Sequence, residues 1–98
     1  MKRYFMIEQH PLHGREIELA PGRRIGRESC EILLLDPAVS RRHALIRQLD
    51  CGLAIEDLQS SNGTWVNERR IAGITAICAG DRLRFGNTVG VVRDARVS

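Results

Sequence analysis

The chain has 98 residues, of which 43% are hydrophobic and 28% are charged, a balance that is typical of a globular protein and excludes a disordered one. The length fits a single domain over residues 1–98, with a core over about residues 3–95. A chain of this size buries a thin core, which excludes a large enclosed substrate cavity, and its net charge of +3 is carried almost entirely by arginine, since Lys2 is the only lysine.

Short alternations of apolar and polar residues follow one another along the chain and predict β-strands. They comprise Ile17 with Leu19, Ala44 with Ile46, Leu53 with Ile55, Leu83 with Phe85, and the run from Val89 to Val92. Turn-forming sequences lie between them: Pro11-Leu12-His13-Gly14, Pro21-Gly22, Asp50-Cys51-Gly52, Asn62-Gly63, Ala79-Gly80-Asp81 and Gly86-Asn87. Many short strands with frequent turns favour a β-sandwich.

The segment that begins at Asp36 carries two conflicting signals. Asp36 followed by Pro37 is typical of a helix N-terminus, and the residues after it approximate helical spacing at Val39, His43, Ile46 and Leu49. The stretch 44–48 also alternates, however, and leads through a turn into another alternating stretch, as a hairpin does. From periodicity alone, helix and hairpin both remain open.

Cysteines and histidines show no pattern of a disulfide framework or a metal site. Cys30, Cys51 and Cys78 are odd in number and lie far apart, which indicates reduced thiols in a cytoplasmic protein. Together with His10, His13 and His43 they lack the paired spacing of zinc ligands, so we expect neither metal nor cofactor. The apolar run from Tyr4 to Ile7 is far too short to cross a bilayer, so we expect no membrane contact.

Three polar clusters fall in predicted loops: Gly26-Arg27-Glu28, Ser40-Arg41-Arg42-His43 and Ser60-Ser61-Asn62-Gly63-Thr64-Trp65. The planar fork of an arginine matches a phosphate, and serine hydroxyls donate to its remaining oxygens. The amide of Asn62 carries both a donor and an acceptor, which suits the main chain of a bound peptide. Residue chemistry alone therefore predicts a surface site for an anion.

These clusters resemble the hallmarks of the forkhead-associated (FHA) domain family, which stand here as Ile25-Gly26-Arg27, Ser40-x-x-His43 and Ser60-Ser61-Asn62-Gly63-Thr64-Trp65-Val66-Asn67. Two later stretches are also similar to the family's Gly-Asp turn and the strand after it: Ala79-Gly80-Asp81-Arg82-Leu83 and Arg84-Phe85-Gly86. The resemblance implies an all-β fold, an eleven-stranded antiparallel β-sandwich with its ligand loops at one edge. The helix signal at Asp36 then gives way to strand and loop.

The same resemblance implies a binding module, not an enzyme, that recognises phosphothreonine on a partner protein or peptide as a signalling or assembly adaptor. By position, Arg27 and Ser40 look like primary phosphate ligands and Arg41 and Ser61 like secondary ones, while Asn62 looks like the clamp on the peptide backbone. Residues that look loop-structuring are Gly26, His43, Gly63 and Thr64. Ala38 occupies a position associated with sequence preference, where Arg42 is a further candidate.

Other interpretations are weaker. The simplest alternative for Arg27 is a surface salt bridge with Glu28 or Glu31, and Ser40 with His43 lacks the acidic orienting residue of a hydrolase. Nucleic-acid binding is not favoured, since one Trp, one Tyr and two Phe offer no evident base-stacking platform. A phosphate-independent assembly module stays open as the alternative function.

We also expect the two largest aromatic side chains of the motifs, Trp65 and Phe85, to lie in the core.

Overall fold

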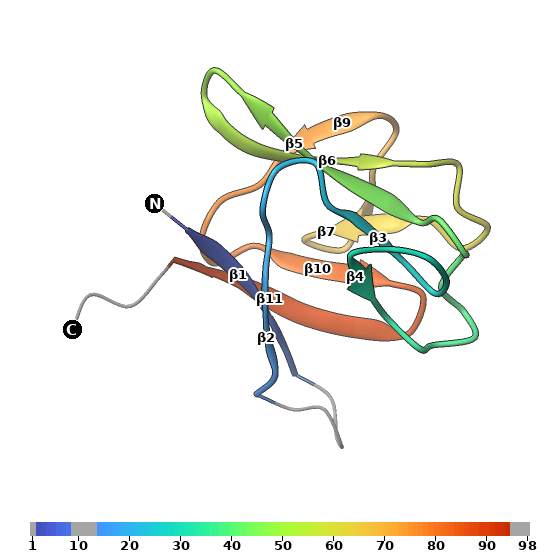
Figure 1. Ribbon diagram of the computed structural model, residues 1–98. Coiled ribbons are helices and arrows are strands. Elements are labelled where there is room, and N and C mark those ends of the chain that lie inside the picture. The colour runs from blue at the N-terminus through green and yellow to red at the C-terminus, as the bar shows by residue number, and fades with distance from the viewer. Residues whose placement is uncertain (1, 9–13, 95–98) are drawn as a thin grey trace.

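The computed structural model describes residues 2–8 and 14–94, which form eleven β-strands and no helix (Figure 1). The strands are β1 (Arg3–Ile7), β2 (Glu16–Glu18), β3 (Arg24–Gly26), β4 (Ile32–Leu33), β5 (Ala44–Leu49), β6 (Gly52–Asp57), β7 (Thr64–Val66), β8 (Arg69–Arg70), β9 (Ile74–Ala76), β10 (Arg82–Phe85) and β11 (Thr88–Asp94). The predicted all-β fold is therefore confirmed. Within the described residues, nothing long and apolar enough to be a membrane-spanning helix occurs.

The strands form two sheets, ordered β2-β1-β11-β10-β7-β8 and β4-β3-β5-β6-β9, which make up the two layers of the sandwich. The pairings in the described part of the chain are antiparallel except one, since β3 and β4 run parallel. That pair departs from the predicted antiparallel arrangement because residues 27–31 do not form a tight hairpin turn. They loop outward, and Leu34 N–H then donates to the Gly26 carbonyl at 2.8 Å.

The core lies between the sheets and follows from the alternation of each strand. Phe5, Leu83 and Phe85 are at most 1% exposed, and the Phe5 and Phe85 rings meet edge to face with centroids 5.4 Å apart. The prediction that Phe85 lies in the core is thus confirmed. The same prediction for Trp65 is wrong, because Thr64 and Val66 point inward and leave Trp65 half-buried on the outer face.

The segment at Asp36 forms a turn and not a helix. Asp36 Oδ1 accepts a hydrogen bond from Ala38 N–H at 2.9 Å, as a helix cap does, yet only one turn follows before the chain extends toward β5. The other oxygen accepts from Asn87 N–H at 2.8 Å and from the Thr88 hydroxyl at 2.9 Å. Tertiary hydrogen bonds therefore use the aspartate that local sequence assigns to a helix.

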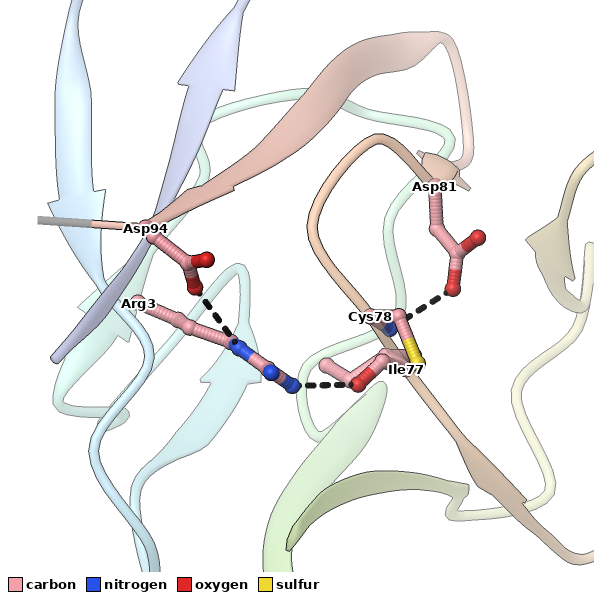
Figure 2. A network of polar contacts seen from close by, with 5 residues as sticks. All are labelled: Arg3, Ile77, Cys78, Asp81 and Asp94. Atoms are coloured by element: carbon pink, nitrogen blue, oxygen red, sulfur yellow. Dashed lines mark hydrogen bonds and ion pairs between the residues drawn. The ribbon is translucent and has the colours of Figure 1, made fainter. Parts of the chain in front are cut away.

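Polar side chains also tie strands together at the far end of the sandwich, where the described chain begins and ends (Figures 1 and 2). Arg3 on β1 pairs with Asp94 on β11 at 3.0 Å and donates to the carbonyl of Ile77, beyond β9 of the other sheet, at 2.7 Å. Asp81, in the predicted Gly-Asp turn, accepts from Cys78 N–H at 2.8 Å. These contacts close the end of the sandwich that lies opposite the loops described next.

Candidate functional site

Three connections lie together at one end of the sandwich, on the right in Figure 1: the β3–β4 loop (27–31), the β4–β5 loop (34–43) and the β6–β7 loop (58–63). The first two are in direct backbone contact, since Arg27 N–H donates to the Ser40 carbonyl at 3.0 Å. Gly26 makes this approach possible, because a Cβ there would overlap the carbonyl oxygen of Arg41. The structure thus brings the three predicted clusters to one surface.

Arg27 is half-buried and is held by one edge of its guanidinium. Its Nε donates to the Val39 carbonyl at 3.0 Å, and no ion pair with any described residue engages its terminal nitrogens. The predicted alternative of a salt bridge to a neighbouring glutamate does not occur, because Glu28 pairs with Arg41 at 3.6 Å and Glu31 accepts from Arg24 N–H at 2.8 Å. Arg27 therefore presents a positioned pair of donors.

The two serines of the predicted site are joined directly. Ser61 N–H, in the β6–β7 loop, donates to Ser40 Oγ, in the β4–β5 loop, at 3.0 Å. Because one lone pair of Ser40 Oγ is used in this way, its proton remains available to a partner outside the fold. Ser40 therefore offers a hydroxyl donor, and its own carbonyl accepts from the backbone N–H of Arg27.

His43 also connects the β4–β5 loop to the β6–β7 loop, through hydrogen bonds of its buried ring. It is 0% exposed, its Nδ1 accepts from Ser40 N–H at 3.0 Å, and its Nε2–H donates to the Gly63 carbonyl at 2.8 Å. Burial lowers the pKa of the imidazole, which keeps it neutral. His43 contacts the backbone of Ser40 and not its hydroxyl, so the pair lacks the serine–histidine hydrogen bond of a hydrolase.

Asp57, at the end of β6, supports the β6–β7 loop, although it is not among the residues that the motifs predict for the site. Its Oδ1 accepts from the Ser60 hydroxyl at 2.5 Å and from the Thr64 hydroxyl at 2.8 Å, and its Oδ2 accepts from Ser60 N–H at 3.2 Å. One carboxylate thus braces both ends of Ser61-Asn62-Gly63. A signal was present, since an aspartate directly after an alternating strand commonly bonds the backbone of the turn that follows.

Asn62 lies exposed at the tip of the β6–β7 loop. Its Nδ2 donates to the Ala38 carbonyl at 2.7 Å, while its Oδ1 has no donor among the described residues. The backbone carbonyl of Asn62 accepts from Trp65 Nε1 at 3.1 Å, and the Arg84 guanidinium stacks 4.4 Å from the centre of the Trp65 ring. The clamp predicted from sequence is therefore held on two sides and keeps a free acceptor.

The two remaining arginines of the predicted site stand apart from this network. The Arg41 side chain is 75% exposed and pairs with the Glu28 carboxylate at 3.6 Å. Arg42 is also exposed, and no hydrogen bond or ion pair within the described residues ties its side chain to the loops. Nor does any cluster of potential metal ligands occur in the part of the chain that the structure describes.

The architecture defines the class of protein: a two-sheet β-sandwich with three polar loops that converge at one end. The FHA domain model matches residues 23–86, which include all three loops, and the chain therefore belongs to the FHA domain family. The resemblance predicted from the motifs is confirmed.

Relatives by sequence agree with this membership. The chain is 38% identical over 74 residues to the FHA domain-containing protein PS1 of Arabidopsis thaliana, and the matched region covers 70% of this chain and 5% of that protein. It is 41% identical over 67 residues to the transcriptional regulatory protein EmbR of Mycobacterium tuberculosis, covering 67% and 17%. It is also 30% identical over 88 residues to FhaB of the same organism, covering 88% and 57%. The chain thus spans only a small part of the first two relatives and little more than half of the third.

Solved structures share the whole fold. A structure from a study of phosphothreonine-dependent FHA domain interactions superposes with a TM-score of 0.85 at 30% identity, over 99% of this chain and 100% of that one. Mycobacterium tuberculosis EmbR in complex with a low affinity phosphopeptide gives 0.86 at 30%, over 99% and 25%. The FhaA FHA domain, complexed with the intracellular domain of Rv3910, gives 0.81 at 32%, over 93% and 99%.

Proposed function

We propose that this chain is a phosphopeptide-binding module that recognises phosphothreonine on a partner protein and acts as a signalling or assembly adaptor. The observation that carries this proposal is the junction at Ser40, whose carbonyl accepts from Arg27 N–H and whose hydroxyl accepts from Ser61 N–H. The junction places the donors of three loops around one point on the surface. The phosphothreonine-dependent interactions of a related FHA domain, and the phosphopeptide bound by EmbR, support it.

The phosphate fits this point chemically. A phosphothreonine carries a charge of about −2 and three strong acceptor oxygens, which call for several charged or hydroxyl donors. The terminal nitrogens of Arg27 supply a bidentate pair and Ser40 a hydroxyl, while Ser61 and the exposed Arg41 supply further donors. Since Arg27 Nε is already bonded to Val39, the phosphate meets the outer edge of the fork.

The peptide main chain fits Asn62. Its Oδ1 accepts an N–H of the ligand, while its Nδ2 stays on the Ala38 carbonyl and fixes the angle of the amide. Ala38 and Arg42 are the candidates for sequence preference, because both belong to the loop that borders this position. In this proposal, residues 1–98 act as one module, in the cytoplasm, where its three free cysteines remain reduced.

Binding titrations test the proposal. A phosphothreonine peptide, its unphosphorylated twin and a short DNA duplex are titrated by fluorescence anisotropy at two salt concentrations. We expect binding of the phosphopeptide alone. Equal affinity for the two peptides would instead indicate phosphate-independent assembly, and DNA binding with a steep salt dependence would indicate a nucleic-acid module.

Substitution of Arg27 locates the binding site. Arg27→Ala should weaken phosphopeptide binding at least about a hundredfold, because each hydrogen bond to a charged group contributes about 1.5 to 3 kcal/mol and the fork makes two. Arg27→Lys should fail as well, since it lacks the fork. The matched control is Arg93→Ala, which removes an equal charge from an exposed residue near the C-terminal end of β11. This variant should bind like the parent.

A further inference from the structure

Arg70, on β8, reaches toward the loop that carries Asn62. Its Cα pairs in register with Trp65 on β7, yet its guanidinium lies over Gly63, two residues closer to the loop. A Cβ on Gly63 would lie 2.5 Å from Arg70 Nε and 3.0 Å from Cζ. The side chain therefore runs along the outer face of the sheet toward the ligand end, over a surface that only a glycine leaves open.

The charge of Arg70 is not used within the described fold. Arg3, Arg47 and Arg82 pair with carboxylates at 3.0, 2.9 and 3.1 Å. Arg70 is exposed, and its side chain has no hydrogen bond or ion pair with any residue that the structure describes. An arginine that is directed along a sheet and left unpaired is available to an anionic group from outside.

The distance between Gly63 and the phosphate site indicates that the anionic group belongs to a ligand residue close to the phosphothreonine. Gly63 follows Ser61 by two residues, which span at most about 7 Å of chain. An extended ligand held at Asn62 advances by roughly 3.3 Å per residue, so side chains one or two positions from the phosphothreonine come level with Gly63. The phosphate itself remains with Arg27 and Ser40. An acidic side chain is the ligand group that matches Arg70.

Resting on the proposed function, we infer that Arg70 is a specificity-determining residue, which selects phosphothreonine ligands that carry an acidic side chain next to the phosphothreonine. The neighbouring Arg69 provides a matched comparison, because successive side chains of a strand point to opposite faces of the sheet. Arg69 is also exposed and carries the same charge, but its Cα pairs with the inward-facing Val66. Its guanidinium is not the one that covers Gly63.

The test compares two phosphothreonine peptides that differ only in having Glu or Gln at the positions flanking the phosphothreonine. We expect the parent chain to prefer the Glu peptide by about threefold, the size of an exposed ion pair. Arg70→Gln should abolish the preference but still bind the Gln peptide like the parent. Arg70→Lys and Arg69→Gln should keep the preference, and thermal melts should show that all variants fold.

The outcomes separate this inference from the proposed function. If the parent binds neither phosphopeptide, the proposed function fails and the inference fails with it. If the parent binds both peptides equally, only the inference is overturned. If Arg70→Gln keeps the preference, or Arg69→Gln loses it to the same degree, the preference reflects overall charge and the assignment to Arg70 is wrong.

Discussion

The backbone N–H of Ser61 donates to the hydroxyl oxygen of Ser40 at 3.0 Å, so a single serine oxygen joins the β4–β5 loop to the β6–β7 loop. The same hydroxyl keeps its proton for a ligand. In the proposed function, Ser40 therefore has two tasks: it sets the distance between the loops and it donates to the phosphate.

Ser40→Ala should lower the affinity for a phosphothreonine peptide by about ten- to a hundredfold, because it removes a hydrogen bond to a charged group worth about 1.5 to 3 kcal/mol. The melting temperature should change little, since the site is on the surface and only the Ser61 N–H loses its partner. Isothermal titration calorimetry measures the affinity. A folded Ser40→Ala variant with the affinity of the parent would contradict the role of Ser40.

Asp57→Ala should destabilise the domain and abolish ligand binding together. The substitution leaves the hydroxyls of Ser60 and Thr64 without their acceptor, and each buried unsatisfied group costs about 1 to 3 kcal/mol. Chemical denaturation measures the loss in the free energy of unfolding. Because Asp57 braces both ends of the β6–β7 loop, binding should be lost even where the domain remains folded.

The neighbouring Glu56 is the control for Asp57. It lies on the same strand and makes a partly exposed ion pair with Arg47 at 2.9 Å. Such pairs contribute at most about 1 kcal/mol, so Glu56→Ala should cost far less than Asp57→Ala and leave binding intact. Equal losses for the two variants would show that Asp57 does not brace the loop.

The sequence predicts most of the fold and the loops of the site because both rest on local patterns. Period-two alternation and turn residues indicate the strands that the structure contains, and the spacing of the three motifs brings Arg27, Ser40 and Ser61 into separate loops of one family fold. The role of Asp36 could not be predicted in this way, because its hydrogen bonds to Asn87 and Thr88 join residues far apart in sequence.

The position of Trp65 illustrates a second limit. In the run from Thr64 to Val66, both the odd and the even positions include residues that a core accepts, so composition does not identify the inward face. Hydrogen bonding of Thr64 to Asp57 places Thr64 inside, and alternation then turns Trp65 outward. There the stacked Arg84 guanidinium and the Asn62 carbonyl replace the contacts of a core.

The free energy of unfolding should decrease as the pH falls below 6.5, the ordinary pKa of histidine. Burial lowers the pKa of His43 in the folded chain, and the hydrogen bond to Gly63 and the charges of Asp57 and Asp36 only partly oppose this. The unfolded chain therefore binds the proton at a higher pH than the folded chain, which favours unfolding between the two pKa values. Denaturation curves recorded from neutral to mildly acidic pH measure this loss.

Replacement of the other histidines isolates the effect of His43. The variant with both His10→Gln and His13→Gln should keep the loss of stability at low pH, since His43 is unchanged. His43→Gln should have a flatter pH profile and a lower stability at neutral pH, because its amide cannot reproduce both ring contacts. If the profile flattens in the double variant instead, the proton uptake belongs to His10 or His13 and the assignment to His43 is wrong.

Gly26→Ala should destabilise the domain more than Gly63→Ala, although Gly63 alone of the two has a positive φ, of 83°. A Cβ at Gly26 overlaps the backbone carbonyl of Arg41, which can move only if the β4–β5 loop shifts away from β3. A Cβ at Gly63 meets the side chain of Arg70, which can rotate away, so the main cost there is the backbone strain of about 1 to 2 kcal/mol. At Gly26, overpacking against the backbone should cost about 1 to 3 kcal/mol. The shift of the β4–β5 loop in Gly26→Ala should also separate Arg27 from Ser40 and weaken phosphopeptide binding. Denaturation and titration of both variants measure the two effects, and a Gly26→Ala variant as stable as Gly63→Ala would show that the β4–β5 loop does not need a glycine at position 26.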